Sequence, residues 1–159
     1  MPDLSSEFQI IDQADPKWLD SLLLDHLKKK TGRSDRNEKE IQISVLDHDQ
    51  PAGGVLAHKQ FESVWIDLIA VNPAFQKHGI GRLLLDELEK RCLQEGISSI
   101  CLSTQDYQAP GFYEKNGFIL TGIMPDVPFE GTNRHYYYKK LTGSGIQNPD
   151  EDRKFCHKE

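Results

Sequence analysis

One segment of the sequence constrains the fold more than any other. It reads "SVWIDLIAVNPAFQKHGIGRLLLDELEK" and joins an apolar run, Ser63 to Val71, to an amphipathic helix through a loop that contains Gly79 and Gly81. The run is apolar on both faces, which is typical of a strand in the centre of a sheet. A strand, loop and helix in this order place unpaired backbone N–H groups at the positive end of a helix dipole. The loop is therefore predicted to bind an anion, and phosphate is the most obvious one.

The residues of the loop suit a phosphate ligand. Gly79 and Gly81 lack the β-carbons that would hold a pyrophosphate away from the backbone donors. Two nucleotide-binding motifs are excluded, because the Walker loop requires Gly-Lys-Ser/Thr and the dinucleotide fingerprint requires a third glycine where Leu84 stands. Side chains that can add donors at the rim are Gln76, Lys77, His78 and Arg82.

Length and composition narrow the protein class. A chain of 159 residues fits one domain, which we place at residues 1–141, followed by a polar tail at residues 142–159. The formal charge of −6 disfavours a nucleic-acid partner. No apolar stretch reaches the roughly 18 residues of a membrane span, and no secretory signal is recognisable, so a cytoplasmic location is expected. Three cysteines without paired spacing argue against disulfides and a metal site.

The apolar patterning predicts a mixed α/β domain. A helix is expected from Asp15-Pro16 to about Gly32, and a short one between Ala109 and Phe118. The helix after the glycine loop should end at Gly96 and turn Leu83, Leu84, Leu88 and Cys92 inward. Strands are expected at residues 7–11, 41–48, 54–61, 63–71, 97–104, 118–124 and 134–141, with "DQPAGG" as the hairpin connection between the second and third. This order is too irregular for a doubly wound parallel sheet.

Two motifs resemble a known family. "VNPAFQKHGIGRLLL" is similar to the acyl-CoA-binding motif of GNAT-type N-acetyltransferases, Gln/Arg-x-x-Gly-x-Gly/Ala, and "APGFYEKNGF" is similar to the second motif of that family. From about Glu62 to Leu141 the expected elements follow the family order, whereas the first sixty residues match only in element type. The resemblance implies an α+β fold with a mixed, mostly antiparallel central sheet. The sheet would be flanked by helices and splayed between its fourth and fifth strands.

The resemblance also implies residues that bind acetyl-CoA as cosubstrate. The loop would hold the pyrophosphate, and the end of the preceding strand would pair with the pantetheine amides. The family often has a pantetheine-binding asparagine where this chain has Asp106. Either Asp106 caps a helix, or Gln105 or Gln108 makes this contact. The cofactor-binding residues implied are Leu68, Ile69, Ala70, Val71, Gln76, Lys77, His78, Gly79, Ile80, Gly81, Arg82 and Gln108.

Acyl transfer from a thioester requires a proton donor for the thiolate and a donor for the oxyanion. Tyr113 matches the family tyrosine that protonates the thiolate, and a phenol can donate at neutral pH. The other interpretation of Tyr113 is a core residue like its neighbours Phe112 and Phe118. A backbone N–H near Ile69 or Ala70, freed by a bulge in the strand, could bind the oxyanion.

Two carboxylates are candidates for the base that accepts the proton of the amine. Asp67 is the only charge inside "VWIDLIAV" and is expected to be buried on one strand face with Trp65, Ile69 and Val71. It could accept the amine proton directly or through water, bind a cationic substrate, or form a structural ion pair. Glu62 is the alternative base.

These features predict an N-acetyltransferase that moves an acetyl group from acetyl-CoA to a primary amine by direct attack on the thioester. The acceptor, a small molecule or a peptide, stays open, and the loop from Met124 to His135 could help to select it. The alternative is a non-catalytic module that senses acyl-CoA. The resemblance to the family is also compatible with a homodimer, and neither a nucleic acid nor a membrane is expected as a partner.

Overall fold

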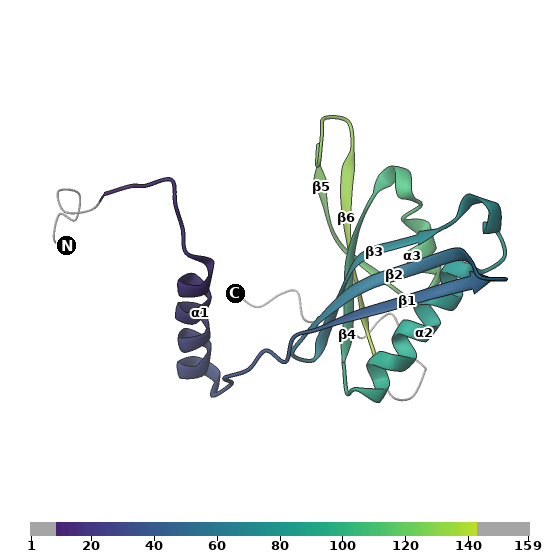
Figure 1. Ribbon diagram of the computed structural model, residues 1–159. Coiled ribbons are helices and arrows are strands. Elements are labelled where there is room, and N and C mark those ends of the chain that lie inside the picture. Colours follow the sequence, from purple (N-terminus) through teal and green to yellow (C-terminus); the bar gives the residue numbers. More distant parts are fainter. Residues whose placement is uncertain (1–8, 143–159) are drawn as a thin grey trace. The chain divides into compact units, whose positions relative to one another are not determined.

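The computed structural model describes residues 9–142, and the chain divides into two compact units, Met1–Arg36 and Asn37–Glu159 (Figure 1). In the first unit, α1 (Pro16–Thr31) begins at Asp15, whose side chain accepts hydrogen bonds from the N–H groups of Lys17 and Trp18. It ends at Gly32, which has a φ of 76°. The helix is confirmed. The strand expected at residues 7–11 is wrong for residues 9–11, which are irregular, and its first two residues lie outside the described range.

The second unit contains a six-stranded sheet in the order β1-β2-β3-β4-β6-β5. Only the β3–β4 pair is parallel, so the expected mixed, mostly antiparallel sheet is confirmed. None of the helices within residues 9–142 is long and apolar enough to cross a membrane. The elements are β1 (Lys39–Asp47), β2 (Gln50–Gln60), β3 (Ser63–Val71), η2 (Pro73–Phe75), α2 (Ile80–Gln94), β4 (Ser99–Gln105), η3 (Asp106–Gln108), α3 (Gly111–Lys115), β5 (Ile119–Pro125) and β6 (Asn133–Lys140).

The β1–β2 hairpin turns more tightly than the sequence indicates. Its turn consists of His48 and Asp49, whose φ angles are 44° and 68°. Positive φ at both central residues gives a turn whose twist matches the flanking strands. Residues 50–54, expected in the connection, therefore belong to β2.

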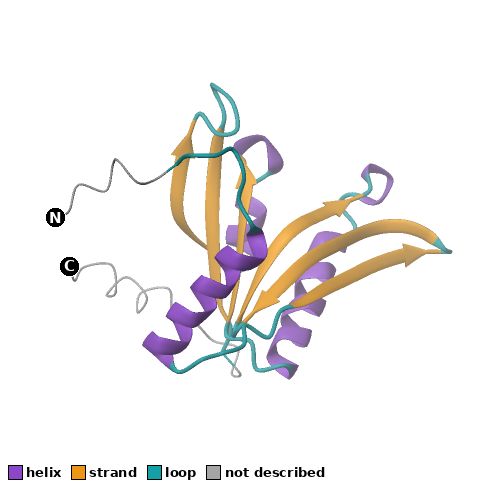
Figure 2. Ribbon diagram, turned by 60° about the vertical axis from the view of Figure 1, so that its left-hand side comes forward, coloured by secondary structure: helices purple, strands orange, loops and turns teal. Residues whose placement is uncertain are grey.

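The sheet splays between β3 and β4, as expected. The two strands pair only from Ser63 to Ile66 and from Ser99 to Leu102, and beyond these residues the halves of the sheet diverge (Figure 2). A bulge on β3 coincides with the divergence, because neighbouring residues of β2 pair with Ile66 and Leu68 and leave Asp67 as the extra residue. A bulge bends its strand and shifts the inside–outside alternation by one residue.

One hydrophobic core lies between α2, α3 and one face of this sheet. Four residues of α2 are buried, namely Leu84, Leu85, Leu88 and Cys92. Leu83, which the sequence placed on the inner face, is 51% exposed, and Leu85 takes its place. Three consecutive leucines leave the phase of a helix open by one residue, and only the packing partner decides which two turn inward. Sheet residues in this core include Val64, Ile66, Ile100, Leu102 and Tyr137.

Gly53 lets α2 approach the sheet. A β-carbon at this position would lie 2.9 Å from the Ala70 carbonyl oxygen and 3.0 Å from Cγ2 of Ile80. We expect Gly53→Val to lower the free energy of unfolding by about 1–3 kcal/mol, as overpacking usually does. Urea unfolding measures this, with Gly122→Ala as the control, because nothing lies within 4 Å of a β-carbon at residue 122. An equal loss in both variants would contradict the expected close packing.

Candidate active site

A cleft of about 540 Å³ lies where β3 ends and α2 begins. Three segments line it, which are the end of β3, the loop with the first turn of α2, and the segment from η3 to α3. All the cofactor-binding residues expected from the sequence lie here except Leu68 and His78. The lining residues are Ile69, Ala70, Val71, Phe75, Gln76, Lys77, Gly79, Ile80, Gly81, Arg82, Gln108, Ala109, Phe112 and Tyr113.

Two expected contacts do not border this cleft. Leu68 is 65% exposed, because it follows the bulge and points away from Ile69. His78 turns its Nδ1 to the carbonyl oxygens of Phe75 and Gln76, at 3.2 Å and 2.9 Å. The His78 ring therefore braces the loop instead of lining the cleft. Sequence reasoning missed Phe75 and Ala109 and assigned Phe112 only to the core, although all three belong to the two motifs.

The loop presents the first turn of α2 to the cleft. The Asn72 side chain accepts a hydrogen bond from the N–H of Ala74, and Lys77 and Gly79 adopt positive φ angles of 67° and 76°. The N–H of Leu83 is bonded to the carbonyl of Gly79 at 3.0 Å, as the first i to i−4 bond of the helix. The N–H groups before it, at residues 80–82, have no partner of this kind and lie at the positive end of the helix dipole.

The two loop glycines have different roles. Gly79 has a positive φ and open space where a β-carbon would be, which suits a ligand close to the backbone. A β-carbon on Gly81 would lie 2.9 Å from Cζ of Phe112. Gly81 also lines the cleft, so its role in phosphate binding stays a prediction. Its missing side chain makes room for α3, the helix that holds Tyr113.

The edge of β3 is open beside this helix end. The N–H of Asn72 donates to the Ala52 carbonyl of β2 at 2.8 Å. Because alternate residues of a strand turn their hydrogen-bonding groups to the same side, Ala70 also faces β2, whereas Ile69 and Val71 face the opening toward β4. The expected bulge exists, two residues before the predicted place, and it is Ile69 rather than Ala70 whose N–H faces the opening.

Tyr113 borders both the cleft and the hydrophobic core. It lines the cleft and is only 7% exposed, packed against Phe112, Phe118 and Tyr137 with ring centroids 5.2–5.9 Å apart. Burial raises the pKa of its phenol, and a hydrogen bond with Thr104 partly opposes this. The hydroxyl therefore keeps its proton at neutral pH and can donate it.

Of the candidates for the pantetheine contact, Gln108 lines the cleft and Asp106 does not. The Gln108 side-chain oxygen accepts from the N–H of Gln105 at 3.1 Å, which leaves its NH₂ group as the donor for a ligand. Asp106 does not cap the helical turn, because Gln105 is the cap. Instead the Asp106 carboxylate accepts from the backbone and side-chain N–H groups of Asn133, at 3.0 Å and 3.2 Å, and ties this turn to β6.

Asp67 differs from its expected environment. Its side chain is 46% exposed, and both carboxylate oxygens lie 2.9 Å from Nδ1 of His58. It shares a face with Trp65, but the bulge turns Ile69 and Val71 to the other face. Glu62, the alternative base, stands at the start of β3, roughly 17 Å along the strand from Asp67. No cluster of metal-ligating side chains occurs within residues 9–142.

The ring of Tyr137 packs against that of Tyr113, and its raised pKa implies a pH dependence of stability. Burial and a 2.9 Å hydrogen bond to the Glu114 carboxylate raise the pKa of Tyr137 to about 12. An unfolded tyrosine ionises near about pH 10. Between these values the folded state binds more protons, so its stability should fall as pH rises, by on the order of 2–3 kcal/mol. Urea unfolding across this range should show a weaker pH dependence for Tyr137→Phe, and an unchanged dependence would contradict the assignment.

Comparison with known proteins agrees with this geometry. The sequence model of the acetyltransferase (GNAT) family matches residues 3–118. A blasticidin-S acetyltransferase from Streptomyces morookaense is 35% identical over 91 residues, which are 57% of this chain and 66% of that protein, slightly less than two thirds of its length.

Solved structures share the fold. The crystal structure of an acetyltransferase from Bacillus cereus is 25% identical, with a TM-score of 0.74, and covers 84% of this chain and 98% of that one. A Bacillus anthracis structure in complex with acetyl coenzyme A is 24% identical, with a TM-score of 0.58, over 65% of this chain and 63% of that one. The family and the fold expected from the two motifs are thereby confirmed, and this chain belongs to the acetyltransferase (GNAT) family.

Proposed function

We propose that this chain transfers an acetyl group from acetyl-CoA to a primary amine by direct attack of the amine on the thioester. One observation carries the proposal, which is that the open edge of β3, the free N–H groups of α2 and the Tyr113 hydroxyl all border one cleft. These are the groups needed to hold a long amide-containing thioester, bind its pyrophosphate and protonate its thiolate.

The cosubstrate would lie along the cleft in an extended form. Backbone N–H groups at residues 79–82 and the side chains of Lys77 and Arg82 would hold the pyrophosphate. Val71 and the carbonyl of Ile69 would pair with the pantetheine amides as a further strand would, and Gln108 would donate from the other wall. The acetyl-CoA complex of the Bacillus anthracis protein, which shares this fold, supports the choice of acetyl-CoA.

The reaction needs few groups beyond these. The Ile69 N–H would donate to the oxyanion that develops when the amine attacks. The Tyr113 hydroxyl would give its proton to the departing thiolate and recover one from solvent. The amine proton would go to Asp67 or to water, and Glu62 is too far along β3 to take it.

Thermal melting with acetyl-CoA, CoA and ATP in parallel tests the donor site. A ligand at 100 times its dissociation constant stabilises the native state by about 2.7 kcal/mol, which raises Tm by several degrees. We expect both CoA species to raise Tm and ATP, which has phosphates but no pantetheine, to leave it unchanged. Equal shifts with ATP, or none with CoA, would overturn the proposal. Shifts with CoA but no thiol release with any amine would favour the acyl-CoA sensor.

A further inference from the structure

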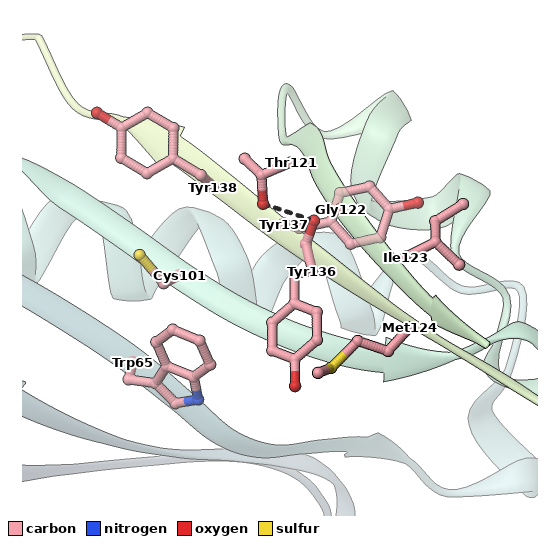
Figure 3. Close-up of a pocket in the computed structure, with 9 residues that line it drawn as sticks. All are labelled: Trp65, Cys101, Thr121, Gly122, Ile123, Met124, Tyr136, Tyr137 and Tyr138. Atoms are coloured by element: carbon pink, nitrogen blue, oxygen red, sulfur yellow. Dashed lines mark hydrogen bonds between the residues drawn. The ribbon is translucent and has the colours of Figure 1, made fainter. Parts of the chain in front are cut away.

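A second hollow, of about 510 Å³, lies on the face of the sheet opposite α2. It runs across β3, β4, β6 and β5, and Figure 3 shows Trp65, Tyr136 and Met124 pointing to the same side of these strands. The rings of Trp65 and Tyr136 lie with centroids 6.5 Å apart at 56°. We call this hollow the aromatic groove, and its lining residues are Trp65, Cys101, Thr121, Gly122, Ile123, Met124, Tyr136, Tyr137 and Tyr138.

The aromatic groove reaches the point where the sheet opens. Trp65 and Ile66 are the last residues of β3 that pair with β4, at Cys101 and Leu102. From the next residue on, the strands separate, and the cleft at the α2 end begins at Ile69. A molecule in the groove can therefore present an amine through the opening to a thioester that lies in the cleft on the other face.

The chemistry of the groove is apolar and aromatic. None of its lining side chains is charged. Burial raises the pKa of the Cys101 thiol, so the thiol stays neutral. The Thr121 hydroxyl already donates to the Tyr136 carbonyl at 3.0 Å. A polyhydroxylated molecule would leave most of its hydroxyls without partners here, whereas a flat ring would cover the partly exposed rings of Trp65 and Tyr136.

Charges of both signs lie near the groove. Arg134 is paired with Met124 across the β5–β6 ladder and shares its face, whereas a carboxylate lies at the other side, beside Trp65. Asp67 stands two residues after Trp65 on the same face, and His58, its partner, is paired with Trp65 across the β2–β3 ladder. Aromatic faces also attract an ammonium group. A ring in the groove with its ammonium group toward Asp67 would satisfy both features.

We infer that the acceptor is a primary amine carried on a flat, apolar ring system, which lies between Trp65 and Tyr136 with the amine directed to the opening beside Asp67. This inference rests on the proposed function and names the acceptor class of that site. It distinguishes this acceptor from polyhydroxylated aminoglycosides and from lysine side chains on polar peptides.

The test is a thiol-release assay with acetyl-CoA and a matched panel of amines. Tryptamine and 2-phenylethylamine carry rings, butylamine and ethanolamine do not, and kanamycin and a lysine peptide represent the other classes. We expect kcat/KM for the ring-bearing amines to exceed that of butylamine by about tenfold or more. If acetyl-CoA raises Tm but a ringless amine, kanamycin or the peptide is preferred, or no amine reacts, the inference fails while the donor site stands.

Variants place the acceptor in the groove. Trp65→Leu should raise KM for 2-phenylethylamine by about tenfold and leave the Kd of acetyl-CoA unchanged. Met124→Lys should raise the same KM, because it adds a positive charge at a half-exposed position, and Met124→Gln should change it much less. Leu93→Ala, an exposed apolar site on α2, is the control for general effects. Unchanged KM in both Trp65→Leu and Met124→Lys would overturn the inference.

Discussion

Replacing Tyr113 by phenylalanine is expected to lower kcat by about 10²- to 10⁴-fold, the usual contribution of a general acid. The ring keeps its contacts with Phe112, Phe118 and Tyr137, so the cleft keeps its shape. Only the hydroxyl that would protonate the thiolate is lost. Steady-state thiol release should therefore show the loss, while calorimetric titration should give an unchanged Kd for acetyl-CoA.

Tyr107→Phe is the matched control for this prediction. Tyr107 lies on the neighbouring turn η3, is well exposed and does not line the cleft. The same chemical change there should leave kcat close to that of the unmodified protein. A Tyr113→Phe enzyme with nearly full kcat would mean that solvent protonates the thiolate and that Tyr113 is only a core residue.

Gly81→Val is expected to have the second largest effect, because it acts on the position of α3. Its β-carbon would stand 2.9 Å from Cζ of Phe112, so the ring and the adjoining Tyr113 must move. Overpacking of this kind costs about 1–3 kcal/mol of stability. A displacement of the proton donor by about 1 Å can cost about 10²-fold in rate. The free energy of unfolding, measured with urea, and kcat should therefore both decrease.

A second pair of variants separates packing from ligand binding. In a Gly81→Ala background, Phe112→Leu removes the atom that clashes, so the double variant should be more stable than the sum of the single changes predicts. Gly111→Ala is the control, since nothing lies within 4 Å of a β-carbon there. If Gly81→Val weakened acetyl-CoA binding but left the stability of the free protein unchanged, the glycine would serve phosphate approach instead.

Much of the site could be predicted because it is local in sequence. The apolar run at residues 63–71 became β3 with the same bounds, and the glycine loop and the short helix around Tyr113 formed where their turn residues indicated. Glycine, proline and asparagine act on their own backbone, so their effect is readable without knowledge of the fold. Ten of the residues that line the cleft were expected, because the two motifs resemble those of the family.

The errors all depend on a partner that the sequence does not show. The alternating segment at residues 9–11 forms no strand, since alternation alone does not supply a pairing edge. Leu85 replaced Leu83 in the core because the sheet chose the phase of α2. Asp67 was expected to be buried, but it is half-exposed and bonded to His58, a residue nine positions earlier.

The sequence by itself determined the strand, loop and helix that form the anion site, the order of the elements from β3 to β6, and the tyrosine within the second motif. Tertiary structure decided which groups face the cleft and which face the aromatic groove. The reason is the bulge at Asp67, which arises from the pairing of β3 with β2 and reverses the inside–outside alternation of every residue after it. A local pattern records the alternation of a strand, but only the register with its neighbour fixes where that alternation changes.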